Sequence, residues 1–238
     1  MFKIKKIQTV KFLSKNLTIL FVIIIICSCA KEPEETPVSI YCSMISEKLV
    51  AFSRLSNFEK KKFQELSDTR FKKYKDDFIE AAETFGLEWE LLAAVAFQES
   101  QWNPKARSAT QVKGMMMLTL PTAASVGVTN RLDPIQSIYG GAQYLSELGD
   151  IVEYGTSSGD KIAFILAAYN LGMTNVSNAI DEISSNPSKL TWLELEKHLI
   201  SRKSSMDSVD YSRGQQTVDF VERVRDYYYL LLSQNCID

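Results

Sequence analysis

The chain has 238 residues, of which 45% are hydrophobic and 24% charged, a composition typical of one globular domain preceded by a leader. Its formal net charge is −2. Without residues 1–28, which hold five lysines and no acidic residue, 22 basic and 29 acidic residues remain, a net charge of −7. Such an acidic surface does not favour nucleic-acid binding.

Residues 1–28 are typical of a secretory signal. Five lysines precede an apolar run over 17–26 that is too short to span a bilayer comfortably. The run ends in Ile26-Cys27-Ser28-Cys29, which resembles a bacterial lipobox. The resemblance implies cleavage before Cys29 and lipidation of its thiol, and Ala30 at the next position favours the outer membrane, facing the periplasm. An uncleaved single-span anchor is the alternative, and both place the rest of the chain in the cell envelope.

Residues 29–42 are expected to form the lipidated cysteine and a solvated tether, because 30–39 hold two prolines and three acidic residues. Cys42 and Cys236 then lie near the two ends of the remaining chain. In an oxidising compartment they could form a disulfide, with two free buried thiols as the alternative.

The rest of the chain has apolar residues at three- and four-residue intervals and no sustained alternation. We therefore expect a mainly α protein, with a helical lead-in at 43–71 and a compact catalytic domain at 72–238. Gly86 ends one helix, and a loop covers 102–113. Further helices are expected at 115–126, 134–149, 159–170, 172–184, 192–200 and 215–233.

Glu99 closes the apolar helical stretch that begins at Leu91. It shares one helix stripe with Trp89, Leu92 and Ala96 and lies at the end where the helix dipole is negative. Both effects disfavour the ionised carboxyl and raise its pKa, as a general acid for a glycosidic oxygen requires. A frayed helix-end residue that points into water is the alternative.

Several segments in order resemble the soluble lytic transglycosylase family, which has a goose-type lysozyme-like fold. They are Glu99–Pro104, Ala106–Ser108, Gly114–Thr119 and Ala168–Asn170. The segments 131–145 and 211–228 are most similar to the F-type membrane-bound lytic murein transglycosylases. The resemblance covers about residues 72–233. Each motif alone is weak evidence for the family, whereas the ordered set is strong evidence. About forty residues separate the tether from the catalytic domain, too few for the solute-binding domain usual in that subgroup.

The resemblance implies a lyase that acts on peptidoglycan glycan strands and needs no cofactor. Glu99 first protonates the oxygen between N-acetylmuramic acid and N-acetylglucosamine, and then accepts the proton of the muramic C6 hydroxyl. An internal 1,6-anhydro ring closes in place of attack by water, so a second carboxylate is not required.

The resemblance also predicts substrate contacts from seven further residues. Met117 stands where the general family has a glutamine, so it can only pack against a sugar. Ser100 has helix capping as an alternative role, and Tyr169 has packing in the core. The predicted substrate-binding residues are Ser100, Ser108, Met116, Met117, Thr119, Tyr169 and Asn170.

Two other functions remain open. A lysozyme-type hydrolase would need a second carboxylate in the cleft, such as Asp133, Glu147 or Asp150. A lipid-anchored peptidoglycan-binding protein without activity would have no need of a protonatable acid. Metal chemistry is not expected, because His198 is the only histidine and neither a Cys-His cluster nor an Asp-rich loop occurs in the sequence.

Overall fold

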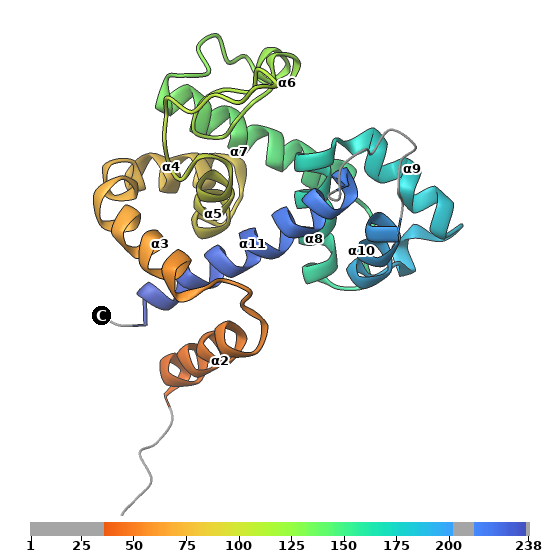
Figure 1. The fold of residues 1–238 in the computed structure, drawn as a ribbon, viewed down its shortest axis with the longest axis horizontal. Helices are drawn as coiled ribbons and strands as arrows, with labels where there is room; N and C mark the ends of the chain where they lie inside the picture. Colours follow the sequence, from red (N-terminus) through yellow and green to blue (C-terminus); the bar gives the residue numbers. More distant parts are fainter. Residues whose placement is uncertain (1–35, 202–211, 237–238) are drawn as a thin grey trace, which may run out of the picture. The chain divides into compact units, whose positions relative to one another are not determined.

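The computed structural model describes residues 36–201 and 212–236, and within these ranges the chain forms helices and turns but no β-strand. The mainly α prediction is confirmed. None of the helices described is long and apolar enough to cross a membrane. Figure 1 shows them in chain order: α2 (Pro37–Phe52), α3 (Asn57–Thr69), η1 (Phe71–Lys73), α4 (Lys75–Phe85), α5 (Trp89–Ser100), α6 (Leu120–Ser125), α7 (Pro134–Ile151), α8 (Ser158–Leu171), α9 (Met173–Ile183), η2 (Pro187–Lys189), α10 (Trp192–Ser201) and α11 (Arg213–Gln234).

The chain divides into a small unit, residues 1–41, and a large unit, residues 42–238. In the small unit, Thr36 and Pro37 start α2. The Thr36 hydroxyl accepts a hydrogen bond from the Ser39 N–H at 3.1 Å, and a proline in the first turn is preorganised for a helix. Residues 37–42 are therefore helical, and the prediction of a tether up to residue 42 was wrong for them. Cys29 lies outside the described residues.

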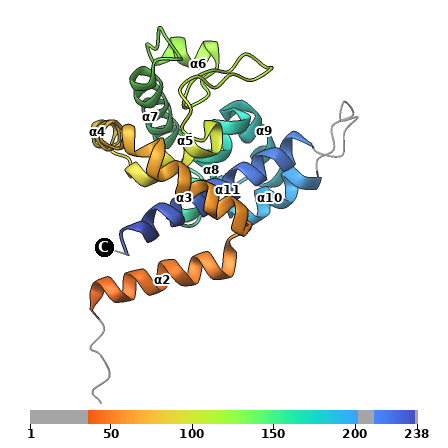
Figure 2. The ribbon, with the colours of Figure 1, turned by 60° about the vertical axis from the view of Figure 1, so that its left-hand side comes forward.

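The core of the large unit is built around α5. Residues 92–97 of this helix are at most 3% exposed, because α4, α7 and α11 pack around it. Figures 1 and 2 both show α5 enclosed by these three helices. A helix that is apolar on all sides is stable only when it is surrounded in this way. The end of α5 is therefore held in a fixed place relative to α11.

An aromatic cluster fixes the chain just beyond α5. Trp102 is fully buried, and its indole Nε1 donates to the Ala93 carbonyl at 2.8 Å. Its ring lies 4.6 Å from the Phe97 ring, 4.8 Å from the Phe71 ring and 5.3 Å from the Phe63 ring, measured between centroids. The lead-in helix α3, which supplies Phe63, therefore packs on the same hydrophobic core as α5.

The helix predicted over 115–126 is shorter in the structure. Only Leu120–Ser125 is helical, and the segment before it consists of turns and isolated bridges. Met117 has a φ of 47°, in the left-handed region, which breaks a right-handed helix. Thr119 then caps α6, because its hydroxyl accepts from the Thr122 N–H at 3.1 Å.

Two glycines let this turn segment approach its neighbours. A Cβ on Gly141 would lie 2.6 Å from the side chain of Met116. A Cβ on Gly114, where φ is 87°, would lie 1.8 Å from the Arg131 carbonyl oxygen. A side chain at position 141 would push the turn segment away from α7. A side chain at position 114 would push it away from Arg131, which lies just before α7.

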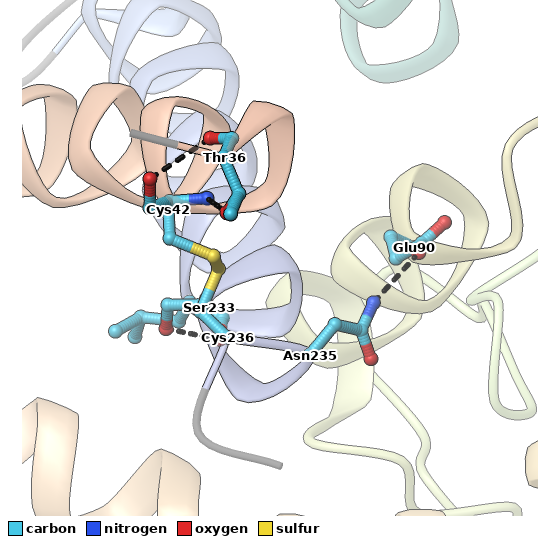
Figure 3. The surroundings of a disulfide bond; sticks show 8 residues. Thr36, Cys42, Glu90, Ser233, Asn235 and Cys236 are labelled. Atoms are coloured by element: carbon cyan, nitrogen blue, oxygen red, sulfur yellow. Dashed lines mark hydrogen bonds between the residues drawn. A yellow bond between two sulfur atoms is a disulfide. The ribbon is translucent and has the colours of Figure 1, made fainter. Parts of the chain in front are cut away.

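Cys42 and Cys236 form a disulfide within the large unit, with their Cα atoms 5.6 Å apart (Figure 3). The bond links Cys42 of α2 to Cys236, which lies two residues beyond the end of α11, and the two cysteines are 194 residues apart in the sequence. A loop of this length restricts the unfolded chain strongly, so the bond stabilises the large unit.

Candidate active site

The end of α5 is a sharp reversal of the chain. α5 stops at Ser100, and the next two residues, Gln101 and Trp102, have φ values of 54° and 55°. Two consecutive left-handed residues that are not glycine are costly, and the buried Trp102 side chain supplies the packing that holds them. Glu99 is therefore presented by a rigid turn.

Glu99 lies in a pocket of about 490 Å³ between α5, α8 and α11. Glu99 is only partly buried as a residue and lines this pocket, as an acid that meets a substrate must. The pocket has a largely polar lining, which consists of Gln98, Glu99, Asn170, Gln216, Asp219, Phe220 and Arg223.

Burial raises the pKa of Glu99 from 4.5 to about 8. The direction is the one expected from the sequence, and desolvation is its cause. Within the described residues, the Glu99 carboxyl makes neither a hydrogen bond nor an ion pair that would stabilise the carboxylate. At neutral pH most Glu99 side chains are therefore protonated and can donate a proton.

Tyr169, on α8, lies close to Glu99. Its hydroxyl donates to the Met116 carbonyl at 2.8 Å, and its ring stacks on Phe220 with the centroids 6.4 Å apart. Burial raises the pKa of Tyr169 well above its usual value, and the negative charge of Glu99 raises it further. The phenol therefore stays protonated, and it fixes the turn segment that contains Met116.

Asn170 is the next residue on α8 and lines the pocket itself. Its Oδ1 accepts a hydrogen bond from the Thr217 hydroxyl at 3.0 Å, which connects α8 to α11. The same hydroxyl also lies 3.0 Å from the Arg213 carbonyl oxygen, so Asn170 and the first turn of α11 share one donor.

The two predicted serines bind backbone groups. The Ser100 hydroxyl is 2.7 Å from the Met115 carbonyl oxygen and accepts from the Asn103 N–H at 3.1 Å. The Ser108 hydroxyl accepts from the N–H groups of Thr110 and Val112, at 3.2 and 3.3 Å. The alternative role of Ser100, closing the turn after the helix, is the one that its contacts favour.

The methionines divide between core and surface. Met115 and Met116 are fully buried, so the prediction that the Met116 side chain contacts substrate was wrong. The Met116 side chain fills the space that Gly141 leaves on α7, and the Met116 carbonyl oxygen accepts from the Tyr169 hydroxyl. Met117 is partly exposed in its left-handed turn, and Thr119 is exposed at the cap of α6.

None of the three carboxylates suggested for a hydrolase lines the pocket that contains Glu99. Asp133 caps α7 by accepting from the Gln136 N–H at 2.9 Å, and Glu147 accepts from the Gln143 amide at 2.9 Å. Asp150 lines a different pocket, which adjoins Phe85 and Gly149. The carboxylate that shares the pocket with Glu99 is Asp219, which accepts from the Gln215 amide at 3.0 Å.

Sequence reasoning missed the contribution of α11 to the pocket. Gln216, Asp219, Phe220 and Arg223 are separated by three, one and three residues, so they share one helix face. This spacing was a usable signal, but it could not show that the face turns toward Glu99. Gln98 lies off the helix stripe that carries Glu99, and it nevertheless lines the same pocket.

These features define a helical protein with one partly exposed, protonated glutamic acid at the end of a buried helix. Residues 76–191 match the model of the transglycosylase SLT domain family. The chain is 40% identical over 196 residues to a membrane-bound lytic murein transglycosylase F of Shewanella loihica, which covers 79% of the chain and 40% of that relative. The corresponding protein of Stutzerimonas stutzeri is 41% identical over 169 residues, 68% of the chain and 34% of the relative.

Among solved structures, the lytic transglycosylase Slt of Pseudomonas aeruginosa, crystallised as an inactive mutant, matches with a TM-score of 0.52 and 20% identity. The match covers 68% of this chain and 24% of that chain, and it supports the fold. The chain thus carries a segment, residues 76–191, that matches the transglycosylase SLT domain family, and it is similar to lytic murein transglycosylases. It spans about 40% of the length of the F-type relatives to which it is similar.

Proposed function

We propose that the chain is a peptidoglycan lytic transglycosylase that cleaves the β-1,4 bond between N-acetylmuramic acid and N-acetylglucosamine. The observation that supports this most is Glu99, a partly buried acid with a pKa of about 8 that lines an open pocket. The relatives that carry the name lytic murein transglycosylase support the same chemistry.

In the first step, the protonated Glu99 donates its proton to the glycosidic oxygen while the bond from that oxygen to the muramic C1 breaks. N-acetylglucosamine leaves with the new hydroxyl, and positive charge develops on the muramic ring. Glu99 is now a carboxylate beside this charge, where it stabilises the cation electrostatically.

In the second step, the Glu99 carboxylate accepts the proton of the muramic C6 hydroxyl, and the C6 oxygen bonds to C1. The product carries a 1,6-anhydro ring, and Glu99 regains the proton with which it started. Closure within one sugar gains from high effective concentration, so no water has to be activated. The Tyr169 phenol and the Asn170 amide support the site from α8, and Met117 and Thr119 are the exposed loop residues for sugar contact.

A lysozyme-type hydrolase is the second candidate function, because Asp219 shares the pocket with Glu99. A carboxylate across the cleft could activate a water molecule or attack C1. The two functions differ in the expected effect of Asp219→Asn. The transglycosylase keeps its anhydro products in this variant, whereas the hydrolase loses turnover.

The test is digestion of purified sacculi with the full chain, followed by mass spectrometry of the soluble products. We expect 1,6-anhydro ends from the wild type and from Asp219→Asn, and no release by Glu99→Gln. Gln keeps the shape and a hydrogen-bonding group at position 99 but cannot exchange a proton. Anhydro products from Glu99→Gln at the wild-type rate would contradict the proposal, and so would reducing ends from the wild type.

We also propose that the protein is a lipoprotein of the cell envelope. It would be anchored in the outer membrane through Cys29 and would act on peptidoglycan from there. The support is the lipobox-like segment 26–29 and the word membrane-bound in the relatives' names. Labelling cells with a radioactive fatty acid should mark the wild-type protein and leave Cys29→Ala unmarked. Equal labelling of both proteins would contradict this assignment.

A further inference from the structure

Gln98 lies next to Glu99 in sequence and lines the same pocket. Its Oε1 accepts a hydrogen bond from Arg223 Nε at 3.3 Å. A guanidinium has five N–H donors and no acceptor, so only the oxygen of the Gln98 amide can face Arg223. The NH₂ group of Gln98 is consequently turned away from Arg223.

Arg223 is itself held firmly. It forms an ion pair with Glu59 of α3, donates to the Tyr227 hydroxyl at 2.9 Å and lies 5.8 Å from the centre of the Tyr227 ring. Glu59 is fixed in turn by a capping box with Ser56 at the start of α3. The orientation of the Gln98 amide is thus imposed by side chains from α3 and α11, both outside the segment 76–191 that matches the family model.

Within the described residues, the Gln98 amide nitrogen donates no hydrogen bond. Its two N–H donors remain available at the pocket wall beside the catalytic acid. A neutral donor suits this place, because a free cation beside Glu99 would lower the pKa that the acid needs. The charge of Arg223 is balanced by Glu59, so it can orient Gln98 without acting as that cation.

We infer that Gln98 is a substrate-binding residue that donates an amide N–H to the acetamido carbonyl of a sugar bound beside Glu99, with Arg223 as its positioning residue. The inference rests on the proposed function, since it takes an N-acetylated glycan as the ligand. Acetamido carbonyls are strong neutral acceptors, and a fixed amide donor distinguishes them from sugars that lack the group.

The test measures binding of the N-acetylglucosamine tetramer to the full chain carrying Glu99→Gln, which prevents turnover. Adding Gln98→Met should raise the dissociation constant on the order of tenfold, the effect of one lost neutral hydrogen bond. Adding Gln98→Glu should weaken binding too, because glutamate keeps an oxygen toward Arg223 but has no N–H donor. Gln64→Met is the matched control, since Gln64 is exposed on α3 and bonds Asp68.

Binding of the glucose tetramer, which lacks acetamido groups, shows whether Gln98 contacts the acetamido carbonyl or another part of the sugar. We expect it to bind equally to the chains with and without Gln98→Met. A loss of affinity for both tetramers would overturn the assignment to the acetamido carbonyl. Unchanged affinity of Gln98→Met for the N-acetylated tetramer would overturn the inference as a whole, as would unchanged affinity of Gln98→Glu.

A double-mutant cycle tests the positioning role. Arg223→Met should weaken binding of the N-acetylated tetramer, and the double variant with Gln98→Met should bind no more weakly than Gln98→Met alone. Arg223→Lys keeps a donor for the Gln98 oxygen, so it should bind the N-acetylated tetramer more tightly than Arg223→Met does. Fully additive losses would overturn the role of Arg223 as a positioning residue for Gln98.

Turnover on sacculi separates failure of the inference from failure of the proposed function. With Glu99 intact, Gln98→Met should raise KM more than it lowers kcat, because the contact binds the sugar in the ground state as well. Anhydro products with an unchanged KM would overturn the inference alone. A wild-type chain that releases no glycan product would overturn the proposed function and the inference together.

Discussion

Two regions adjoin Glu99, and they are built differently. The loop segment, residues 101–119, is irregular and is held by buried side chains and backbone contacts, with Trp102 and Met116 in the core. The α11 face, defined as Gln216, Asp219, Phe220 and Arg223, is regular and mostly polar, and its position depends on neighbouring helices. The loop segment therefore fixes where Glu99 points, while the α11 face supplies most of the groups that a ligand in the pocket would meet.

The comparison predicts that the loop segment depends on its buried anchor. Trp102→Ala should lower the free energy of unfolding by about 3–5 kcal/mol, the usual cost of removing a buried tryptophan side chain. The variant also loses the hydrogen bond to the Ala93 carbonyl and the packing that holds two left-handed residues. Urea denaturation followed by circular dichroism measures this change.

Phe58→Ala is the control, because Phe58 is 78% exposed. It should change the free energy of unfolding by less than about 0.5 kcal/mol. If Trp102→Ala cost no more than this control, the anchor role of Trp102 would be wrong. If Trp102→Ala stayed folded with full activity, the loop segment would not be what orients Glu99.

The α11 face depends instead on how its helix is held. The disulfide between Cys42 and Cys236 fixes the end of α11, about three turns beyond Arg223 along the helix. Replacing both cysteines by serine should lower the free energy of unfolding by about 2–4 kcal/mol. Activity at room temperature should persist, since the pocket residues lie in the first half of α11 and retain their packing on α5 and α8.

The same denaturation experiment on the wild-type chain with and without a reducing agent checks this expectation. Reduction should reproduce the effect of the double serine variant and should not change that variant further. Equal stability of the oxidised and reduced wild type would show that the bond contributes nothing to the large unit. A complete loss of activity on reduction would show that the α11 face needs the bond directly.

Glu99 joins the two regions and carries a smaller cost to stability. Its pKa is about 8 in the folded chain and about 4.5 when unfolded, so the folded state binds its proton more tightly. This contribution is fully present below pH 4.5 and is lost as the pH rises to 8. At pH 8, Glu99→Gln should therefore be more stable than the wild type by about 1–2 kcal/mol, allowing for partial exposure.

The measurement is the free energy of unfolding of both chains at several pH values between 4.5 and 8. The advantage of Glu99→Gln should grow with pH across this range. Glu83→Gln, an exposed acid on α4, serves as the control and should show no such trend. A pH-independent difference between wild type and Glu99→Gln would contradict the raised pKa of Glu99.

Much of the fold could be read from the sequence, because helical spacing and helix stops are local signals. The helix that carries Glu99 near its end and the turn at Gly86 follow directly from them. The segment at 115–118 could not, because its apolar residues favour a helix while Met117 adopts a left-handed turn and Met116 packs on Gly141 of α7. Thr36 and Pro37 start α2 earlier than the acidic composition of that stretch indicated.

The site could be predicted where its residues are close in sequence. Glu99, Tyr169 and Asn170 lie near one another, since each is in the last turn of a helix with a buried core-facing side. Arg223 and Glu59 could not be assigned, because the contact that brings them to Gln98 spans more than a hundred residues. The Met116 error has a similar origin, since only Gly141 on another helix reveals the space that Met116 fills.

The central claim is that Glu99 closes an internal ring and does not activate water. Digesting sacculi with the wild-type chain in water labelled with heavy oxygen, followed by mass spectrometry of the released ends, tests it most directly. The account predicts anhydro ends that contain no label, because the C6 oxygen of the sugar itself bonds to C1. Reducing ends that carry one heavy oxygen at C1 would contradict it and identify the chain as a hydrolase.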